Sequence, residues 1–256
     1  MQMSGNTILI TGGGSGIGRG LAEAFQAIGN KVVISGRRKH ALDETAARND
    51  GMKALVLDIK NPEAIRSFAA QLEKDCPDLN AVIHNAGINR AQDVKSGGVA
   101  DAEEIVTTNL LGPIRLTAAL LPMLLAKPRA AIMTVSSGLA FAPMAITPAY
   151  CATKAAIHSY TQSLRYQLGN TSVQVLELIP PYVQTELMGA WQANDPRAMP
   201  LNEFIAETMN ILKSSPDATE ICVERVKPLR FAERNGDYDA FLKNFNDAMM
   251  ATAAGH

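Results

Sequence analysis

Short apolar runs alternate with longer segments of helical periodicity along most of this chain. A short apolar run bounded by turn residues is typical of a buried strand, whereas apolar residues that recur every third or fourth position are typical of a helix. By these patterns, strands are predicted at residues 6–11, 31–36, 53–59, 80–87, 130–138 and 173–181. Helices are predicted at residues 17–29, 39–49, 62–75, 102–126 and 150–168.

The strands are apolar on both faces and are separated by helices, which has a direct consequence for the fold. Such strands form a parallel sheet that helices cover on both sides. The chain is therefore predicted to be an α/β protein, a doubly wound Rossmann-type three-layer sandwich with a parallel sheet of about seven strands. Residues 220–229 are a candidate for the seventh strand, and residues 236–251 for a final amphipathic helix. A single domain over residues 1–256 accounts for the pattern.

Residues 186–218 have weaker strand signals and contain the tryptophan, Trp191. This segment follows the sixth predicted strand, at the carboxyl edge of the sheet where ligands bind in folds of this kind. We expect it to be a mobile substrate lid within the domain, which would close over an apolar substrate. The alternative is a helix packed on the surface.

Composition and charge narrow the class of partner. The chain is 47% hydrophobic and 19% charged, with a net charge of −1, so it can bury a substantial core. A charge so close to zero gives no basic surface for nucleic acid or for an anionic membrane, and neither partner is expected. The most apolar run, residues 116–126, is too short to span a bilayer and contains Pro122, which favours a buried helix.

The three cysteines, Cys76, Cys151 and Cys222, are scattered along the chain. Their spacing builds neither a disulfide framework nor a metal-binding knuckle, so no metal site is expected and a reducing compartment is favoured. The first residues lack the basic and apolar regions of a signal peptide. These features together predict a cytoplasmic protein.

A glycine-rich loop, "TGGGSGIG" at residues 11–18, joins the first predicted strand to the first predicted helix. Free backbone N–H groups and the helix dipole make such a junction an anion site. In a dinucleotide-binding loop, Gly12 would permit the tight turn, Gly16 would let the backbone approach a pyrophosphate, and Gly18 would allow close packing. The alternative is an ordinary glycine turn, but the strand, loop and helix occur in the order that the motif requires.

The end of the second predicted strand normally selects the cofactor. An acidic residue there holds the ribose of NAD, whereas a basic residue accommodates the 2′-phosphate of NADP. Here Gly36 stands where the acid is expected, and Arg37 and Arg38 follow. Because guanidinium groups bind phosphate as a bidentate fork, NADP(H) is favoured over NAD(H). The alternative is a solvated basic loop.

Tyr150 and Lys154 stand four residues apart in "PAYCATKAAIHSY", within a predicted helix. Residues at this spacing lie on one face of a helix, so the phenol and the ammonium group can point at the same spot. Most such pairs are surface neighbours. In this chain the pair follows a dinucleotide loop, which favours a proton-handling role.

At this point the chain resembles the short-chain dehydrogenase/reductase family, in its short single-domain branch. The resemblance covers nearly the whole length through "TGGGSGIG", "LDI", "HNAG", "NLLGP", "TVSSG", "YCATK" and "PPYVQTEL". The wording around the "YCATK" segment is similar to the DltE-like oxidoreductase subgroup. Two positions depart from the family pattern, since His84 replaces the usual Asn and Pro181 the usual Gly. The basic residue that often accompanies NADP preference is also absent at Ser15.

The resemblance implies both a catalytic set and a cofactor site. The implied catalytic residues are Asn109, Ser137, Tyr150 and Lys154. The glycine loop, the basic pair and the resemblance together assign cofactor binding to Gly12, Ser15, Gly16, Ile17, Gly18, Arg37, Arg38, Asp58, Ile59, Asn85, Ala86, Gly87, Tyr150, Lys154, Pro180, Val183 and Thr185. Relatives commonly pair two long helices across a dimer interface, so a homodimer or homotetramer is expected.

The implied reaction transfers hydride between nicotinamide and a carbonyl or secondary alcohol, with Tyr150 as general acid/base. A free tyrosine titrates near pH ~10, so we expect Lys154, helped by the oxidised nicotinamide, to lower the pKa of Tyr150. Ser137 would donate a hydrogen bond to the substrate oxygen, and Asn109 would support a water that relays protons to Lys154. The alternatives are a non-catalytic NADP(H)-binding sensor or scaffold on the same fold, or an NAD-dependent alcohol dehydrogenase.

Overall fold

Seven parallel strands form one sheet in the computed structural model, which describes residues 1–253. The strand order is β3-β2-β1-β4-β5-β6-β7, and every neighbouring pair is parallel. This is the sheet that the apolar runs predict. The strands are β1 (Thr7–Thr11), β2 (Lys31–Gly36), β3 (Lys53–Val56), β4 (Leu79–His84), β5 (Ala130–Val135), β6 (Val173–Ile179) and β7 (Glu220–Cys222).

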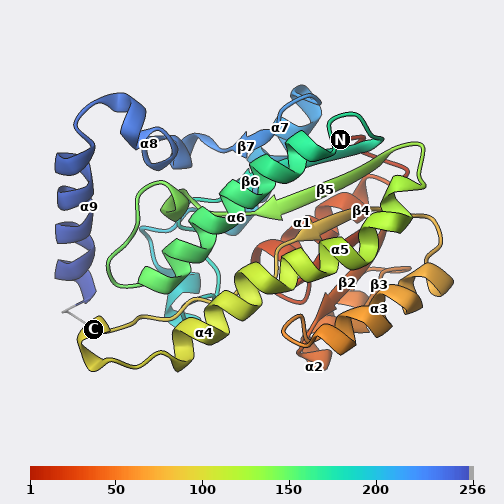
Figure 1. The fold of residues 1–256 in the computed structure, drawn as a ribbon, viewed down its shortest axis with the longest axis horizontal. Coiled ribbons are helices and arrows are strands. Elements are labelled where there is room, and N and C mark those ends of the chain that lie inside the picture. The colour runs from red at the N-terminus through yellow and green to blue at the C-terminus, as the bar shows by residue number, and fades with distance from the viewer. Residues whose placement is uncertain (254–256) are drawn as a thin grey trace.

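Helices cover both faces of the sheet and bury a separate core on each (Figure 1). One face carries α1 (Gly16–Ala27), α2 (Lys39–Ala47) and α7 (Leu201–Ser214). The other carries α3 (Pro62–Asp75), α5 (Gly112–Leu125) and α6 (Pro148–Gln167). Along β1, Ile8 and Ile10 face the first core and Leu9 the second, because successive side chains of a strand point to opposite faces. The doubly wound sandwich is confirmed.

A continuous helical stretch over residues 100–125 combines α4 (Ala100–Val106), a π-helical turn (Thr107–Leu111) and α5. By length and composition this stretch is long enough to cross a membrane, so the shortness expected from residues 116–126 does not hold. Its leucines explain the apolar character, since Leu116, Leu120 and Leu124 are fully buried against the sheet. One side of this helical stretch therefore packs in the hydrophobic core, and its other side faces outward.

Several strands end earlier than predicted. β3 ends at Val56 instead of residue 59, β4 at His84 instead of residue 87, and β5 at Val135 instead of residue 138. β7 covers only Glu220–Cys222 of the predicted 220–229, because two short helices follow it. They are a 3-10 turn (Glu224–Val226) and α8 (Lys227–Arg230), which has Pro228 in its first turn. The apolar residues beyond each strand belong to loops at the carboxyl edge of the sheet.

The C-terminal helix α9 (Tyr238–Ala253) lies against the loop that follows β5. The Tyr238 hydroxyl donates a hydrogen bond to the Phe141 carbonyl oxygen at 3.0 Å, and the Asn246 side chain bonds the backbone of Pro143 and Ala145. In Figure 1 this helix stands at one end of the molecule, beside the start of α6. The chain's last helix is thus attached to a loop at the carboxyl edge of the sheet.

Candidate active site

The glycine loop makes the tight turn that its sequence predicts. Gly12 has a φ of +69°, a left-handed conformation that side chains disfavour. A Cβ on Gly18 would lie 2.3 Å from the Gly12 carbonyl oxygen, so only glycine lets α1 approach the loop this closely. Helix α1 begins at Gly16 with no side-chain cap at Ser15. The first backbone N–H groups of α1 therefore face the carboxyl edge of the sheet, as an anion site requires.

Thr11 fastens this loop to the loop after β4. Its hydroxyl oxygen accepts hydrogen bonds from the backbone N–H groups of Asn85 at 3.1 Å and Ala86 at 3.0 Å. In return, the Asn85 amide donates to the Thr11 carbonyl oxygen at 3.0 Å. Thr11 was not among the predicted site residues. The threonine that opens "TGGGSGIG" was the available signal.

Asn109 lies on the π-helical turn between α4 and α5, a distortion that often marks functional sites. It is buried, and its side-chain oxygen accepts from the Ile88 N–H at 2.9 Å while its amide donates to the Ile88 carbonyl at 2.9 Å. The amide also donates to the Thr153 hydroxyl at 3.3 Å. Its side chain therefore positions the loop after Gly87 and ties it to α6. The support of a relay water by Asn109 stays a prediction.

Ser137, Tyr150 and Lys154 come together at the carboxyl end of β5. Tyr150 and Lys154 are both buried on α6, and the Lys154 Nζ lies 5.4 Å from the centroid of the Tyr150 ring. The Ser137 side chain follows β5, accepts a hydrogen bond from the Leu139 N–H at 3.1 Å, and lies close enough to the Tyr150 phenol to favour a lower pKa there. The Lys154 Nζ donates to the Val135 carbonyl oxygen at 2.7 Å. A phenol, a hydroxyl and an ammonium group thus share one buried site.

Burial has the largest effect on the pKa of Tyr150. It raises this pKa above its ordinary value, and the nearby Ser137 hydroxyl only partly opposes that rise. Burial also lowers the pKa of Lys154 to about 8, with Glu177 opposing the fall. Burial therefore disfavours the charged forms of both groups. The lowering of the Tyr150 pKa by Lys154 together with the oxidised nicotinamide stays a prediction. An additional positive charge is needed to make the phenolate accessible.

The two arginines after β2 have different partners. The Arg38 Nη2 donates to the Ser15 hydroxyl at 2.8 Å, which places its guanidinium group against the glycine loop. The Arg37 Nη1 lies 3.6 Å from Glu104 Oε1, a carboxylate that also bonds Lys60 and Arg90. Arg38 is therefore better placed than Arg37 to reach a phosphate at this loop.

The other predicted cofactor residues line the same edge of the sheet. Asp58 follows β3 and accepts a hydrogen bond from the Lys60 N–H at 3.0 Å. Ile59 is buried against Gly112, and the Pro180 carbonyl accepts from the Gly138 N–H at 2.9 Å. Thr185 reaches the glycine loop, since a Cβ on Gly16 would lie 3.3 Å from its methyl group. The remaining members of the set are Ile17, at the start of α1, and Val183, which is buried and forms a bridge with Met199.

The predicted lid divides into two parts. In the second part, α7 buries Phe204 and packs on α1, where Ile205 would lie 2.8 Å from a Cβ on Gly20. This helix belongs to the sandwich. The first part, residues 186–200, includes a 3-10 turn (Ala190–Asn194) and is fastened by Gln192, whose amide donates to the Val183 carbonyl at 2.8 Å and the Thr185 hydroxyl at 3.0 Å. Only this first part covers the loop after β6.

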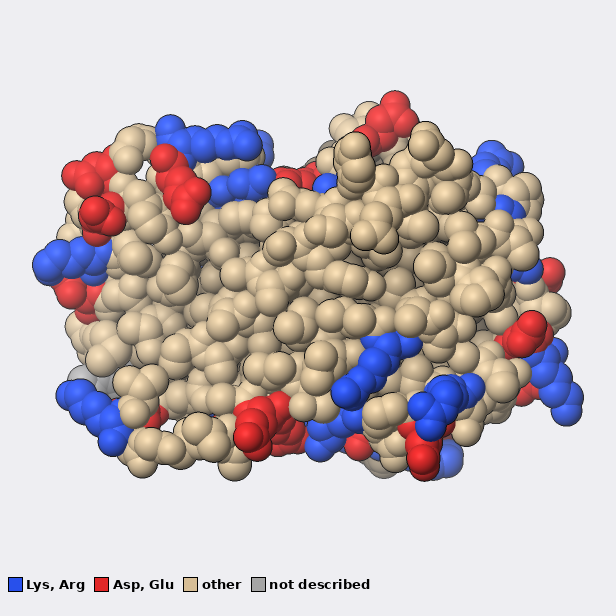
Figure 2. Space-filling model, viewed as in Figure 1, with Lys and Arg blue, Asp and Glu red and all other residues tan. Residues whose placement is uncertain are grey.

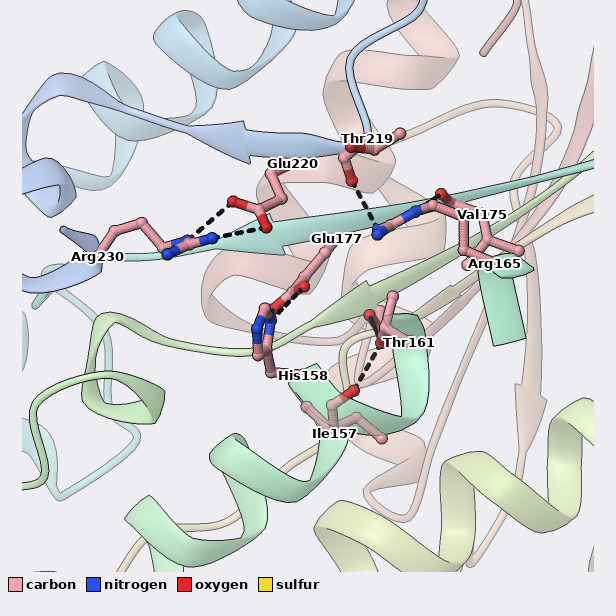
Figure 3. A network of polar contacts seen from close by, with 10 residues as sticks. Ile157, His158, Thr161, Arg165, Val175, Glu177, Thr219, Glu220 and Arg230 are labelled. Atoms are coloured by element: carbon pink, nitrogen blue, oxygen red, sulfur yellow. Dashed lines mark hydrogen bonds and ion pairs between the residues drawn. The ribbon is translucent and has the colours of Figure 1, made fainter. Parts of the chain in front are cut away.

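His158, to which the sequence assigned no role, bonds a buried carboxylate one turn beyond Lys154 (Figure 3). Its Nδ1 lies 2.8 Å and 3.0 Å from the two oxygens of Glu177, a residue of β6 with no exposed surface. Two features of the sequence could have indicated this pair. His158 stands four residues after Lys154, and Glu177 interrupts an otherwise apolar strand. Among the described residues, His158, Glu177 and Glu220 also have side-chain ligand atoms within 4.8 Å of one another.

His84 and Cys151 are packing residues. His84 is buried, its Nε2 lies 2.8 Å from the Thr117 hydroxyl, and burial lowers its pKa to about 4. Cys151 is buried, and its sulfur accepts from the Met144 N–H at 3.2 Å. Neither side chain contacts Tyr150 or Lys154 through a hydrogen bond in the part of the chain that the structure describes.

Comparison with known proteins gives the family. A family model described as short chain dehydrogenase matches residues 6–196. The chain belongs to the short-chain dehydrogenase family. This short-chain dehydrogenase is 38% identical over 252 residues to the uncharacterized oxidoreductase DltE of Bacillus subtilis (strain 168), with 96% of this chain and 98% of that protein covered. The family and the DltE-like subgroup predicted from the motifs are thereby confirmed.

Solved structures of other short-chain dehydrogenases share the fold. A short chain dehydrogenase from Burkholderia cenocepacia J2315 in complex with NADP is 25% identical, with a TM-score of 0.80 and coverage of 95% of this chain and 98% of that chain. The 3-ketoacyl-(acyl-carrier-protein) reductase of Brucella melitensis, complexed with NADH, is 25% identical, with a TM-score of 0.78 and coverage of 88% and 100%. The present chain is thus an oxidoreductase of this family, and its relatives include proteins with either dinucleotide bound.

Proposed function

We propose that this short-chain dehydrogenase is an NADP(H)-dependent oxidoreductase that interconverts a carbonyl compound and a secondary alcohol. The observation that carries the proposal is the buried cluster of Ser137, Tyr150 and Lys154 at the carboxyl edge of the sheet, on the side where the glycine loop also opens. Tyr150 is the general acid/base. Function within this fold depends on the site, and this site combines a proton donor with a dinucleotide cradle.

The residues present fit a dinucleotide. The glycine loop leaves no room for side chains where the pyrophosphate binds in such folds, since a Cβ on Gly18 would clash with Gly12. The nicotinamide end would lie near Tyr150, Lys154 and the loop after β6. When bound, the nicotinamide supplies or accepts the hydride. The protein's own residues align it and handle the proton.

Tyr150 donates its phenolic proton to the substrate oxygen in the reductive direction. Ser137, which lies beside that phenol, donates a second hydrogen bond to the oxygen as negative charge grows on it. The Lys154 ammonium then stabilises the phenolate that remains, from a position fixed by the Val135 carbonyl. Because burial raises the Tyr150 pKa, this stabilisation also depends on the positive charge of the oxidised nicotinamide.

The preference for NADP(H) rests on Arg38. Its contact with Ser15 holds a guanidinium group at the glycine loop. Position 36, where an acidic residue would bind a ribose hydroxyl of NAD, is a glycine. A guanidinium fork suits a 2′-phosphate. The NADH-bound relative keeps an NAD-dependent alcohol dehydrogenase as the second candidate.

We assign the substrate lid to residues 186–200 rather than to the whole of residues 186–218. This segment carries Met188 and Trp191, and Trp191 is half exposed. The Tyr182 hydroxyl donates to Asp195 at 2.9 Å, so the segment is fastened to the loop after β6 that contacts the nicotinamide end in the proposed complex. An apolar group on the substrate suits these side chains.

We propose a homodimer or homotetramer that pairs the helices α4, α5 and α6. Figure 2 shows the face that carries these helices, where most charged side chains gather at the edges and leave a broad central area of uncharged residues. Tyr166 on α6 is 91% exposed and Leu125 on α5 is 43% exposed. An uncharged face that exposes large side chains such as Tyr166 and Leu125 suits association with a second copy of the chain. Light scattering after size exclusion tests the oligomeric state.

The same surface and the net charge of −1 give no support to a nucleic acid or membrane partner. Leu116, Leu120 and Leu124 pack one side of residues 100–125 against the sheet. The exposed side is therefore a more suitable contact for a second copy of the chain than for a membrane. We therefore expect the protein to act in the cytoplasm on a small-molecule substrate.

Oxidation of NADPH and of NADH against a panel of ketones, aldehydes and quinones tests the proposed function. Turnover with NADPH that Tyr150→Phe abolishes supports the proposal. Binding of NADPH without turnover on any member of the panel would instead support the non-catalytic sensor or scaffold. Faster turnover with NADH would support the NAD-dependent enzyme.

A further inference from the structure

A charged residue stands in the interior of the sheet, where the cost of burial is high. Glu177 belongs to β6, one of the inner strands, and has no exposed surface. Isolating a carboxylate from water costs several kcal/mol unless cations or donors compensate it. A buried carboxylate without a role would be replaced at little cost by an apolar residue of similar volume. Its partners therefore indicate what it does.

The first partner of Glu177 is His158. The Nδ1 of His158 lies within 3.0 Å of both carboxylate oxygens, and the ring stands edge-on to Phe141 at 4.6 Å between centroids. The His158 side chain is 17% exposed, so it connects the buried carboxylate to the solvent side of the network. Figure 3 shows the two side chains pointing at each other from α6 and β6.

The second charged group near Glu177 is Lys154, which makes no hydrogen bond to it among the described contacts. It stands four residues before His158, on the same face of α6. Its Nζ bonds the carbonyl of Val135, and Val135 pairs in register with Leu178, the residue next to Glu177. The charge of Glu177 favours the ammonium form of Lys154 against the effect of burial. The Glu177 carboxylate therefore bonds His158 directly and acts through its charge on Lys154, one turn of α6 away.

The neighbouring carboxylate is already neutralised. Glu220 on β7 pairs in register with Glu177, and both of its oxygens accept from Arg230, at 2.8 and 2.9 Å. Because Arg230 pairs with Glu220, the charge of Glu177 remains available to His158 and Lys154. The spacing of His158, Glu177 and Glu220 would suit a metal ion, but Arg230 holds the Glu220 oxygens that such an ion needs. The charged and titratable groups around Glu177 are Lys154, His158 and Arg165 on α6, Glu220 and Cys222 on β7, and Arg230 on α8.

We propose that Glu177 and His158 are positioning residues that set the charge of Lys154 during catalysis. The Glu177 carboxylate keeps the Lys154 ammonium charged, and His158 limits this effect by drawing the same carboxylate toward itself. The inference rests on the proposed function, because Lys154 is the group through which the pair acts on Tyr150. It extends the site by one turn of α6 and one residue of β6.

The expected direction follows from the charges. Glu177 opposes the fall of the Lys154 pKa, which burial brings to about 8. Without this carboxylate the ammonium loses its proton at a lower pH, so activity that needs the ammonium is lost at a lower pH. Without His158 the carboxylate serves Lys154 alone, and the activity survives to a higher pH.

The pH dependence of kcat tests Glu177 through three variants. Glu177→Gln should move the alkaline limb of the profile to lower pH by about one unit. Glu177→Asp, which keeps the charge, should restore the limb toward its wild-type position. Glu220→Gln is the matched control, the same change on the register partner, and should leave the limb in place. The inference would be overturned if the alkaline limb lay at the same pH in all three variants. It would also be overturned if Glu177→Gln and Glu220→Gln shifted the limb equally.

His158 is tested in the opposite direction. His158→Leu removes the donor and should move the alkaline limb to higher pH. His158→Asn keeps a donor to Glu177 and should stay near the wild type. A Leu variant whose limb stays in place or moves to lower pH contradicts the proposed sharing of the carboxylate.

A binding measurement separates this inference from the proposed function. If no carbonyl compound is turned over, NADP⁺ affinity can still be followed by calorimetry between about pH 6 and pH 10, because Lys154 would also hold the nicotinamide ribose. Glu177→Gln should lose affinity at lower pH than the wild type and Glu220→Gln, and identical curves would overturn the inference. Dialysis against EDTA should leave affinity and the melting temperature unchanged. A loss that Zn²⁺ restores would assign the cluster to a metal instead.

Discussion

The Nζ of Lys154 bonds the Val135 carbonyl oxygen at 2.7 Å, at the last residue of β5. This contact anchors the ammonium group between the sheet and the Tyr150 ring, whose centroid lies 5.4 Å away. The anchor matters because a lysine side chain is long and mobile in water. In this protein its charge is held at one place, beside the residue that handles the proton.

Replacing Tyr150 by Phe should abolish most turnover and spare cofactor binding. The change removes only the phenolic oxygen, and general acid–base catalysis contributes about 10²–10⁴-fold to a rate. We expect kcat to fall by that factor in an NADPH oxidation assay, while the dissociation constant for NADPH stays within about twofold. Tyr160→Phe on the same helix is the matched control and should retain activity. Equal activity of the two variants would remove Tyr150 from the reaction.

Replacing Lys154 by Met should reduce both kcat and cofactor affinity. Methionine keeps much of the side-chain volume but removes the donor to the Val135 carbonyl and the positive charge beside Tyr150. A loss of about a hundredfold in kcat is expected, which is typical for one preorganised electrostatic group. Steady-state kinetics and calorimetry with NADPH measure the two effects. A change in affinity alone would restrict Lys154 to holding the cofactor.

The wild-type kcat should fall as pH rises through about 8, the pKa to which burial lowers Lys154. The ammonium is the low-pH form, so the loss lies on the alkaline side of the profile. In Lys154→Met this limb should be missing, because no group at that position titrates. A limb that persists in the variant would belong to another residue.

Arg38 should discriminate between the two cofactors. Because its guanidinium group lies against the glycine loop, Arg38→Ala should raise the KM for NADPH by about tenfold or more and leave the KM for NADH nearly unchanged. Arg37→Ala should have a smaller effect, since Arg37 faces Glu104. The double variant should resemble Arg38→Ala. Equal changes with both cofactors would contradict a 2′-phosphate site.

Closure of residues 186–200 should be visible in the fluorescence of Trp191, the one tryptophan of the chain. Its indole N–H donates to the Met188 carbonyl at 3.2 Å, and the ring is half exposed. Adding NADPH together with a substrate should change the emission maximum as the ring leaves water. An unchanged spectrum at saturating ligand would count against the lid.

Gly18→Ala should destabilise the protein and weaken NADPH binding together. The added Cβ would lie 2.3 Å from the Gly12 carbonyl oxygen, so the loop or α1 must shift, at a cost of about 1–3 kcal/mol. Gly98→Ala is the control, because its nearest neighbour would lie at 3.6 Å. Thermal unfolding with and without NADPH measures both effects. Equal melting temperatures for the two variants would contradict the tight packing.

Much of the fold could be predicted because each buried strand and each amphipathic helix has a strong periodic pattern. The strand ends could not be placed, since apolar residues such as Ile59 continue into loops that are buried around the site. The neighbourhood of Tyr150 and Lys154 was predictable because one helix carries both. The pair of His158 and Glu177 was not, because it joins a helix to a strand through tertiary contact.

The direction in which the Tyr150 pKa shifts on folding could not be predicted from the sequence either. A motif shows that a cation stands one turn away from the phenol, but it does not show how much water the two groups lose on folding. In the structure, burial has the larger effect on both. The charge state of this site therefore depends on the whole set of neighbours, Glu177 included.

The contact between Tyr238 and the Phe141 carbonyl joins the last helix of the protein to the segment that carries Ser137. Substitutions in α9, which is remote in sequence from every motif of the family, should therefore change the rate of the reaction. Relatives that differ only there are natural places to look for altered catalysis.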